Sequence, residues 1–322
     1  MPWDLIQLNN GTSIPSIAFG TWTLGGGQQA TNHVDQAISV GFSHIDTAQA
    51  YRNEAEAGVA IHESGLSREE IYITTKYSGV DGLDIDTSIQ NSLKNLGVEY
   101  VDLYLIHNPR LAVPDIPTAW ARMEKVQTDG YAKSIGVSNF NVPQLETLLA
   151  SAKIKPVANQ AGLAPRSCPK RGFADQIIQI LFHPYVLESQ APIVEYGNEN
   201  GIVSEAYSVL VPLTRQPGGP VDAPVREIAS RLKVQPEQVL LAWAKAKGVV
   251  VVTSSTKKER LEGYLAAGDL ELTDDDIAAI DAAGVIGTRR ITARTFLRRA
   301  AAVALVGAAV LGACSYLGIN VI

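Results

Sequence analysis

The sequence predicts an α/β protein with the (β/α)8 architecture of a TIM barrel, with an N-terminal β-hairpin and a C-terminal hydrophobic helix. Three observations lead to this fold. Eight short apolar segments alternate with amphipathic segments over about 280 residues, as βα units do. No linker divides this region. Three consecutive apolar segments end on a titratable residue, at the face where barrel strands converge on a substrate.

The elements follow one another at regular intervals. The hairpin is expected from Leu5–Leu8 and Ser13-Ile14 around the turn Asn9-Asn10-Gly11, and would close the bottom of the barrel. The predicted strands are Ile17–Trp22, Phe42–Asp46, Ile71–Lys76, Val101–His107, Lys133–Val137, Pro156–Gln160, Val203–Tyr207 and Val249–Thr253. The predicted helices are Thr31–Val40, Asn53–Glu63, Asp84–Leu96, Pro117–Asp129, Val142–Ser151, Pro192–Asn200, Val225–Leu232, Pro236–Lys247 and Lys258–Ala266.

Composition limits the class of protein. A chain of 322 residues with 46% hydrophobic and 19% charged residues suits one large domain with a substantial core. The net charge of −6 gives no electrostatic reason to expect nucleic acid as a partner. Only Cys168 and Cys314 are present, so we expect a reducing compartment and no disulfide framework. The first residues lack the pattern of a signal peptide, and we expect no metal site.

The C-terminal end has a different composition. Residues 300–322 contain no charged side chain, and five arginines precede them. A helix of this length, at about 1.5 Å per residue, can cross a bilayer, and basic flanks stay on the cytoplasmic side. We therefore divide the chain into a barrel (1–285), a basic linker (286–299) and a transmembrane tail (300–322) that anchors it to the endoplasmic reticulum or the mitochondrial outer membrane. The alternative is a mildly apolar helix that packs on the barrel or on a partner.

Four motifs carry a family resemblance. They are Gly41-Phe42-Ser43-His44-Ile45-Asp46-Thr47-Ala48 with Tyr51, Lys76-Tyr77-Ser78, Asp102-Leu103-Tyr104-Leu105-Ile106-His107-Asn108-Pro109, and Gly136-Val137-Ser138-Asn139-Phe140. With these motifs in this order, the chain resembles the aldo-keto reductase superfamily across about Leu5–Gly284. It is most similar to fungal members that reduce aldehydes, ketones or α-keto compounds. The resemblance implies reduction of a small-molecule carbonyl to the alcohol, and we expect a monomer.

The resemblance implies a catalytic tetrad of Asp46, Tyr51, Lys76 and His107. Hydride transfer to a carbonyl carbon builds negative charge on the oxygen, so a donor must supply a proton there. Tyr51 would be this donor. Its unperturbed pKa is about 10, and we expect the Lys76 ammonium to lower it. Asp46 would hold Lys76 charged and in place, and His107 would orient the carbonyl by a hydrogen bond. Taken singly, these residues could equally be a helix cap, a surface charge or a core histidine.

The resemblance also implies a nicotinamide cofactor, NADPH in preference to NADH. The residues assigned to the nicotinamide are Ser138, Asn139, Gln160 and Tyr207. Those assigned to the pyrophosphate are Ser208 and Leu210, and those assigned to the adenosine end are Ser254, Ser255, Thr256, Lys257 and Arg260. Many relatives have a lysine in place of Ser254, but Lys257 and Arg260 can supply charge for a phosphate. Candidates for the substrate wall are Trp22, Tyr77 and Trp120.

One segment departs from the family pattern. Asn159-Gln160 is followed by 161–179 (AGLAPRSCPKRGFADQIIQ), and the expected continuation resumes at Ile180. The segment is either a functional loop over the mouth of the barrel, which barrels tolerate, or a translated retained intron, because its removal restores the pattern in frame. Since it follows Gln160 directly, a second function stays open. The chain could be a membrane-attached, NADP(H)-binding accessory or redox-sensing protein that does not turn over.

The tail anchor makes a testable prediction. A chain that ends at Thr295 should remain in the supernatant, whereas the full chain should sediment with membranes, because only the full chain carries the apolar run. Fractionation of cells that express each form measures the difference. Equal partitioning of the two forms would contradict the anchor.

Overall fold

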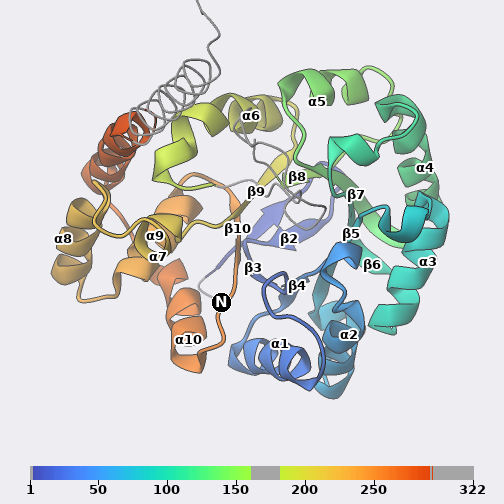
Figure 1. Ribbon diagram of the computed structural model, residues 1–322, viewed down its shortest axis with the longest axis horizontal. Coiled ribbons are helices and arrows are strands. Elements are labelled where there is room, and N and C mark those ends of the chain that lie inside the picture. The colour runs from blue at the N-terminus through green and yellow to red at the C-terminus, as the bar shows by residue number, and fades with distance from the viewer. Residues whose placement is uncertain (1–2, 161–181, 291, 293–322) are drawn as a thin grey trace, which may run out of the picture.

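Eight parallel strands close into a barrel at the centre of the molecule, as Figure 1 shows. The computed structural model describes residues 3–160, 182–290 and 292. The strands are β3 (Ile17–Gly20), β4 (His44–Asp46), β5 (Tyr72–Tyr77), β6 (Val101–Ile106), β7 (Ala132–Ser138), β8 (Ala158–Gln160), β9 (Val203–Tyr207) and β10 (Val250–Thr253). Each pairs with the next in the chain, and β10 pairs with β3 to complete the ring. The predicted (β/α)8 architecture is confirmed.

Helices surround this barrel on all sides in Figure 1. They are α1 (Gln28–Val40), α2 (Glu54–Glu63), α3 (Ile85–Leu96), α4 (Ile116–Thr128), α5 (Val142–Leu149), α6 (Leu187–Glu199), α7 (Val211–Thr214), α8 (Asp222–Leu232), α9 (Pro236–Ala246) and α10 (Lys258–Ala266). Several begin where the sequence offers a side-chain acceptor for a free backbone N–H. The N–H of Thr87 donates to Asp84, that of Thr118 to Asp115, and that of Gln144 to Asn141.

Alternation along the strands separates two apolar regions. One set of strand side chains, such as Ile45 and Ile73, packs against the helices. The other set, including Leu105 and Val250, packs with Leu8 and Ile14 of the N-terminal segment. This second region lies where the hairpin covers the barrel.

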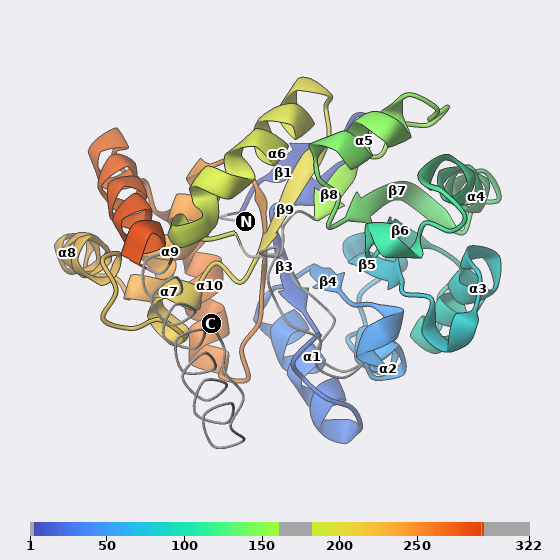
Figure 2. The same cartoon turned by 45° about the horizontal axis from the view of Figure 1, so that its top comes forward.

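The hairpin consists of β1 (Leu5–Gln7) and β2 (Ser13–Pro15), which pair antiparallel. In Figure 1, β2 is seen within the ring of strands, and Figure 2 shows β1 near β8. Asn9 in its turn donates to the carbonyl of Pro156, just before β8, at 2.8 Å. The hairpin therefore closes the bottom of the barrel, as predicted. The carboxyl ends of the strands lie at the opposite, open end.

The start of α6 differs from the sequence prediction. We expected the helix to begin at about Pro192. The structure has Pro192 inside α6, which begins at Leu187 directly after a 3-10 turn, Pro184–Val186. The 3-10 turn leads directly into the helix, so the helix begins before Pro192 and Pro192 lies in its interior.

A further helix, residues 274–290, packs beside α8 and α9. Asp281 accepts hydrogen bonds from Trp243 at 2.9 Å and from Lys247 at 2.6 Å, both on α9 or at its end. The helix approaches the preceding 3-10 turn closely, since a Cβ at Gly284 would clash with the carbonyl oxygen of Pro184. It continues past the predicted boundary at 285, so the first part of the predicted linker belongs to the packed barrel.

The predicted tail, 300–322, lies outside the described residues, as does the inserted segment 161–179. Within the described part of the chain, no helix is both long enough and apolar enough to cross a membrane.

Candidate active site

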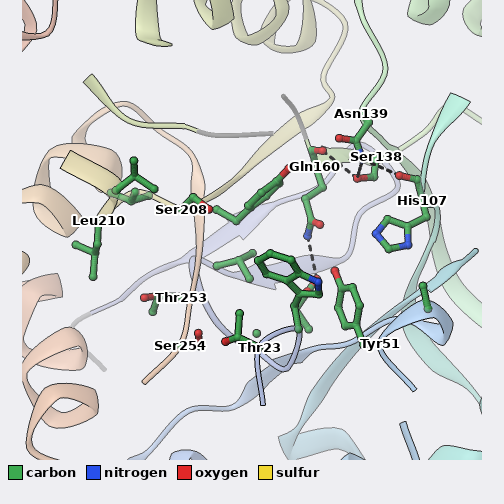
Figure 3. Close-up of a pocket in the computed structure, with 18 of the residues that line it drawn as sticks. Thr23, Tyr51, His107, Ser138, Asn139, Gln160, Ser208, Leu210, Thr253 and Ser254 are labelled. Carbon is green, nitrogen blue, oxygen red and sulfur yellow. Dashed lines mark hydrogen bonds between the residues drawn. The ribbon is translucent and has the colours of Figure 1, made fainter. Parts of the chain in front are cut away.

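A cavity of about 470 Å³ opens at the carboxyl ends of the strands. Figure 3 shows its lining, with Tyr51 and His107 toward one side and Leu210 and Ser254 toward the other. Its wall includes three of the four residues predicted to be catalytic, and the fourth, Lys76, lies behind that wall.

Asp46 and Lys76 form an ion pair in the interior of the barrel. The Lys76 side chain is fully buried, and its Nζ donates to both carboxylate oxygens of Asp46, at 2.7 and 2.8 Å, and to the backbone oxygen of Thr47, at 2.9 Å. The three N–H donors of the ammonium are thus all used. Burial lowers the pKa of Lys76, but the carboxylate of Asp46 and other anionic groups outweigh it, so the net pKa is raised. Lys76 is therefore charged at neutral pH.

Tyr51 lies in a 3-10 turn, Gln49–Tyr51, next to this ion pair. The Lys76 Nζ is 5.1 Å from the centre of its ring, and the ring meets that of His107 edge to face at 5.6 Å between centroids. Burial raises the pKa of Tyr51 to about 12, although the Lys76 charge acts in the lowering direction. A net lowering of this pKa was predicted from the sequence. That prediction was wrong, because the loss of water on burial outweighs the neighbouring charge.

His107 is held by the hydroxyl of Ser78, which was not among the predicted site residues. Its Nδ1 lies 2.8 Å from Ser78 Oγ, which is also 3.3 Å from the backbone oxygen of Lys76. This contact holds the ring in place, and which of the two atoms donates depends on the tautomer of the imidazole. Burial and the Lys76 charge lower the pKa of His107 to about 3. The imidazole is therefore neutral at pH 7.

Ser138, Asn139 and Gln160 lie together on the next part of the wall. Ser138 Oγ donates to the Gln160 backbone oxygen at 3.1 Å, and Asn139 Nδ2 donates to the His107 backbone oxygen at 2.7 Å. Asn139 has a positive φ of 69°, and its Oδ1 is buried with no partner among the described residues. An unpaired acceptor, together with Gln160 and the half-buried Tyr207 in the same wall, suits a flat heterocycle that carries an amide donor. The residues present thus fit the nicotinamide end of the predicted cofactor.

The opposite end of the cavity contains Ser208, Leu210, Ser254 and Arg260 from the predicted set. Ser208 has a φ of 62°, a left-handed conformation that is unfavourable for a non-glycine residue. Ser255, Thr256 and Lys257 do not line the cavity. Instead, Ser255 Oγ accepts the backbone N–H of Lys257 at 3.1 Å just before α10.

Of the three predicted substrate residues, only Trp22 lines the cavity, with 39% of its surface exposed. Tyr77 follows Lys76 on β5 and points to the other side of the strand, where its hydroxyl donates to the Leu83 carbonyl at 3.1 Å. Trp120 is on α4 and points into the core, 1% exposed, with its Nε1 donating to the carbonyl of Ile154 at 2.9 Å. The predictions for Tyr77 and Trp120 were wrong.

Other residues of the site were not predicted from the sequence. Arg215 and Tyr264 line the end near Leu210, and Arg110 lines the side near His107. Glu205, on β9, is 1% exposed and accepts a hydrogen bond from Gln160 Nε2 at 3.1 Å. Burial first, and then the Asp46 charge, raises the pKa of Glu205 to about 7. A carboxylate in the short strand Val203–Tyr207 was the signal that could have identified it.

A model of the Aldo/keto reductase family matches residues 16–284, most of the described barrel. The chain belongs to this family. The match confirms the family predicted from the four motifs and the predicted class of activity, that of an oxidoreductase acting on carbonyl groups.

Similar proteins cover nearly the whole barrel. The chain is 37% identical over 270 residues to an NAD/NADP-dependent indole-3-acetaldehyde reductase of Schizosaccharomyces pombe, covering 82% of this chain and 86% of that protein. It is 35% identical to a glyoxal reductase of Bacillus subtilis, covering 87% and 92%. Among solved structures, a Bombyx mori aldo-keto reductase in complex with NADP matches with a TM-score of 0.74 at 31% identity, covering 87% of this chain and 92% of that one.

The raised pKa of Glu205 predicts a pH-dependent stability. Its folded pKa of about 7 exceeds the usual glutamate value, so its contribution to stability is full in acid and is lost as the pH rises through about 7. Glu205→Gln cannot ionise and escapes this loss. The Tm of the variant, relative to that of the natural chain, should therefore rise between about pH 5 and about pH 8. Thermal unfolding in matched buffers measures it, and a pH-independent difference would contradict the assignment.

Proposed function

We propose that this chain reduces an aldehyde, ketone or α-keto compound to the alcohol with NADPH, and that Asp46, Tyr51, Lys76 and His107 are its catalytic residues. The observation that carries the proposal is the arrangement at the end of the cavity. A protonated tyrosine and a neutral histidine face one space, and a buried ammonium lies directly behind them. The names of the similar proteins, which are reductases of aldehydes and glyoxal, support the same chemistry.

Each residue has a distinct part in the reaction. NADPH, when bound along Asn139, Gln160 and Tyr207, supplies the hydride. With a pKa of about 12, Tyr51 carries its proton at neutral pH and can donate it to the carbonyl oxygen. The tyrosinate that remains lies next to the Lys76 ammonium, which stabilises it. His107 is neutral and lines the cavity, where we expect its Nε2 to donate a hydrogen bond that orients the carbonyl.

We propose NADPH over NADH because two cationic side chains, Arg215 and Arg260, line the end of the cavity away from Tyr51. An additional phosphate on the adenosine ribose would meet positive charge there. Ser254 lines the same end and can donate to phosphate oxygens.

The catalytic assignment predicts that Tyr51→Phe loses about 10²-fold or more of kcat, because the proton donor is removed. Its NADPH affinity should stay within about twofold, since the ring remains. The absorbance decrease of NADPH with a panel of aldehydes and α-keto esters measures turnover. Tyr77→Phe is the matched control: the same atom is deleted from a tyrosine outside the cavity, and turnover should persist. Normal turnover of Tyr51→Phe would refute the assignment.

The same assay separates this proposal from the non-catalytic alternative. Tight NADPH binding without reduction of any carbonyl would support the alternative. It should be run with segment 161–179 retained and with it deleted. The described chain leaves the cavity wall at Gln160 and returns with Phe182, whose N–H donates to the Tyr207 carbonyl at 3.0 Å. The described residues on either side of the segment, Gln160 and Phe182, therefore lie beside the predicted cofactor site. Activity that appears only after deletion would identify the segment as the obstruction.

The cofactor assignment predicts that Arg260→Ala weakens NADPH binding by about 10-fold while changing NADH binding by less than about twofold, because a charge-assisted hydrogen bond to phosphate is lost. Quenching of tryptophan fluorescence on titration with each cofactor measures both affinities. Lys257→Ala, which removes a cation that does not line the cavity, should have a smaller effect and serves as the control. Equal weakening for both cofactors would contradict recognition of the phosphate by Arg260.

A further inference from the structure

We propose that Glu205 is a positioning residue: together with Asp46, it fixes the side-chain amide of Gln160 with its nitrogen toward the two carboxyl groups and its oxygen toward the cavity. The proposal rests on the proposed function for the identity of the molecule that this oxygen receives, the carboxamide of the nicotinamide. The orientation itself follows from the protein alone.

The carboxyl groups that face Gln160 come from two other strands. Gln160 ends β8, and its Nε2 donates to Asp46 Oδ2 on β4 at 2.9 Å and to Glu205 Oε2 on β9 at 3.1 Å. All three side chains are at least 96% buried. Water therefore does not compete for these hydrogen bonds, and each carboxyl group must find its donors within the barrel.

Two acceptors decide which way the amide points. A primary amide has two N–H donors on nitrogen and only acceptors on oxygen. With nitrogen inward, both N–H groups are paired. With oxygen inward, the amide carbonyl would face the Asp46 carboxylate and leave both N–H groups without these partners. Asp46 alone could pair with only one N–H in this geometry, because its oxygens also accept from Lys76. Glu205 supplies the second acceptor.

The orientation of Gln160 determines what the cavity wall offers to a ligand. Gln160 lines the cavity, and its Oε1 is left as an acceptor. The neighbouring Asn139 is fixed in the same sense, because its Nδ2 donates to the His107 carbonyl and to Ser138 Oγ, at 2.7 and 2.8 Å. Its Oδ1 therefore also remains an acceptor. The wall thus presents acceptors from two amides, which suits the two N–H groups of a carboxamide.

The surrounding charges do not disturb this role. Asp46 and Lys76 neutralise each other, and Glu205 is the additional acid beside them. Tyr72 on β5 and Tyr207 on β9 are uncharged at neutral pH, since burial raises the pKa of both hydroxyls. Whether Glu205 is ionised or carries a proton on its other oxygen, Oε2 keeps a lone pair for Gln160. The hydrogen bond therefore persists across neutral pH.

The test compares Glu205→Gln with Glu205→Met. Both side chains have similar length and shape, but only glutamine retains an oxygen acceptor for Gln160. Fluorescence titration should show NADPH affinity within about twofold of the natural chain for Glu205→Gln, and about 10-fold weaker for Glu205→Met. In a Gln160→Met background, Glu205→Met should have no further effect, because the residue through which it acts is gone. An unchanged affinity of Glu205→Met, or an equal loss in both backgrounds, would overturn the proposal.

A second measurement needs no cofactor. In protein labelled with ¹⁵N-glutamine, the side-chain amide signals of Gln160 are assigned by their absence in Gln160→Met. These signals should be retained in Glu205→Gln and should shift or broaden in Glu205→Met as the amide loses its fixed orientation. Such a change without any NADPH binding would uphold the role of Glu205 and refute the proposed cofactor instead. Unchanged signals in Glu205→Met would overturn the role of Glu205 whatever the cofactor.

Discussion

The buried ion pair between Asp46 and Lys76 is the interaction on which the rest of the site depends. An ammonium with no exposed surface stays charged only if its donors are paired, and the Asp46 carboxylate and the Thr47 carbonyl pair all three. Removing one partner of a buried pair typically destabilises a protein by about 3–5 kcal/mol, because a charge is left alone. The pair also joins β4 to β5, so the same contact that fixes the charge fixes the position of the strands that carry it.

The fixed cation then sets the protonation of its neighbours. It reinforces the effect of burial on His107, whose pKa falls to about 3, and opposes the effect of burial on Tyr51, whose pKa still rises to about 12. At neutral pH the cavity wall therefore has a protonated Tyr51 and a neutral His107. In the proposed reaction, the negative charge that develops when Tyr51 gives up its proton is placed next to a cation that is already there, so little reorganisation is needed at that moment.

The barrel and the four residues of the predicted tetrad could be predicted from sequence because both follow from strand ends. In a closed parallel barrel, the residues just beyond consecutive strands must converge, whatever the details of packing. The positions of Tyr77 and Trp120 outside the cavity could not be predicted, because a local pattern does not show which face of a strand or helix meets the cavity. The direction of the Tyr51 pKa and the contact between Glu205 and Gln160 depend on burial and on pairing between distant strands, which a single sequence does not reveal.

Because the hairpin β1–β2 covers one end of the barrel, the two ends have different functions. It covers one end of the strands, where Leu8 and Ile14 pack against Leu105 and Val250, and the cavity opens at the other end. A natural variant in the covered end would alter how long each molecule stays folded, whereas one around the opening would alter what it converts. The loops around the opening can therefore change in sequence without destabilising the barrel, and a new substrate range can arise on the same fold.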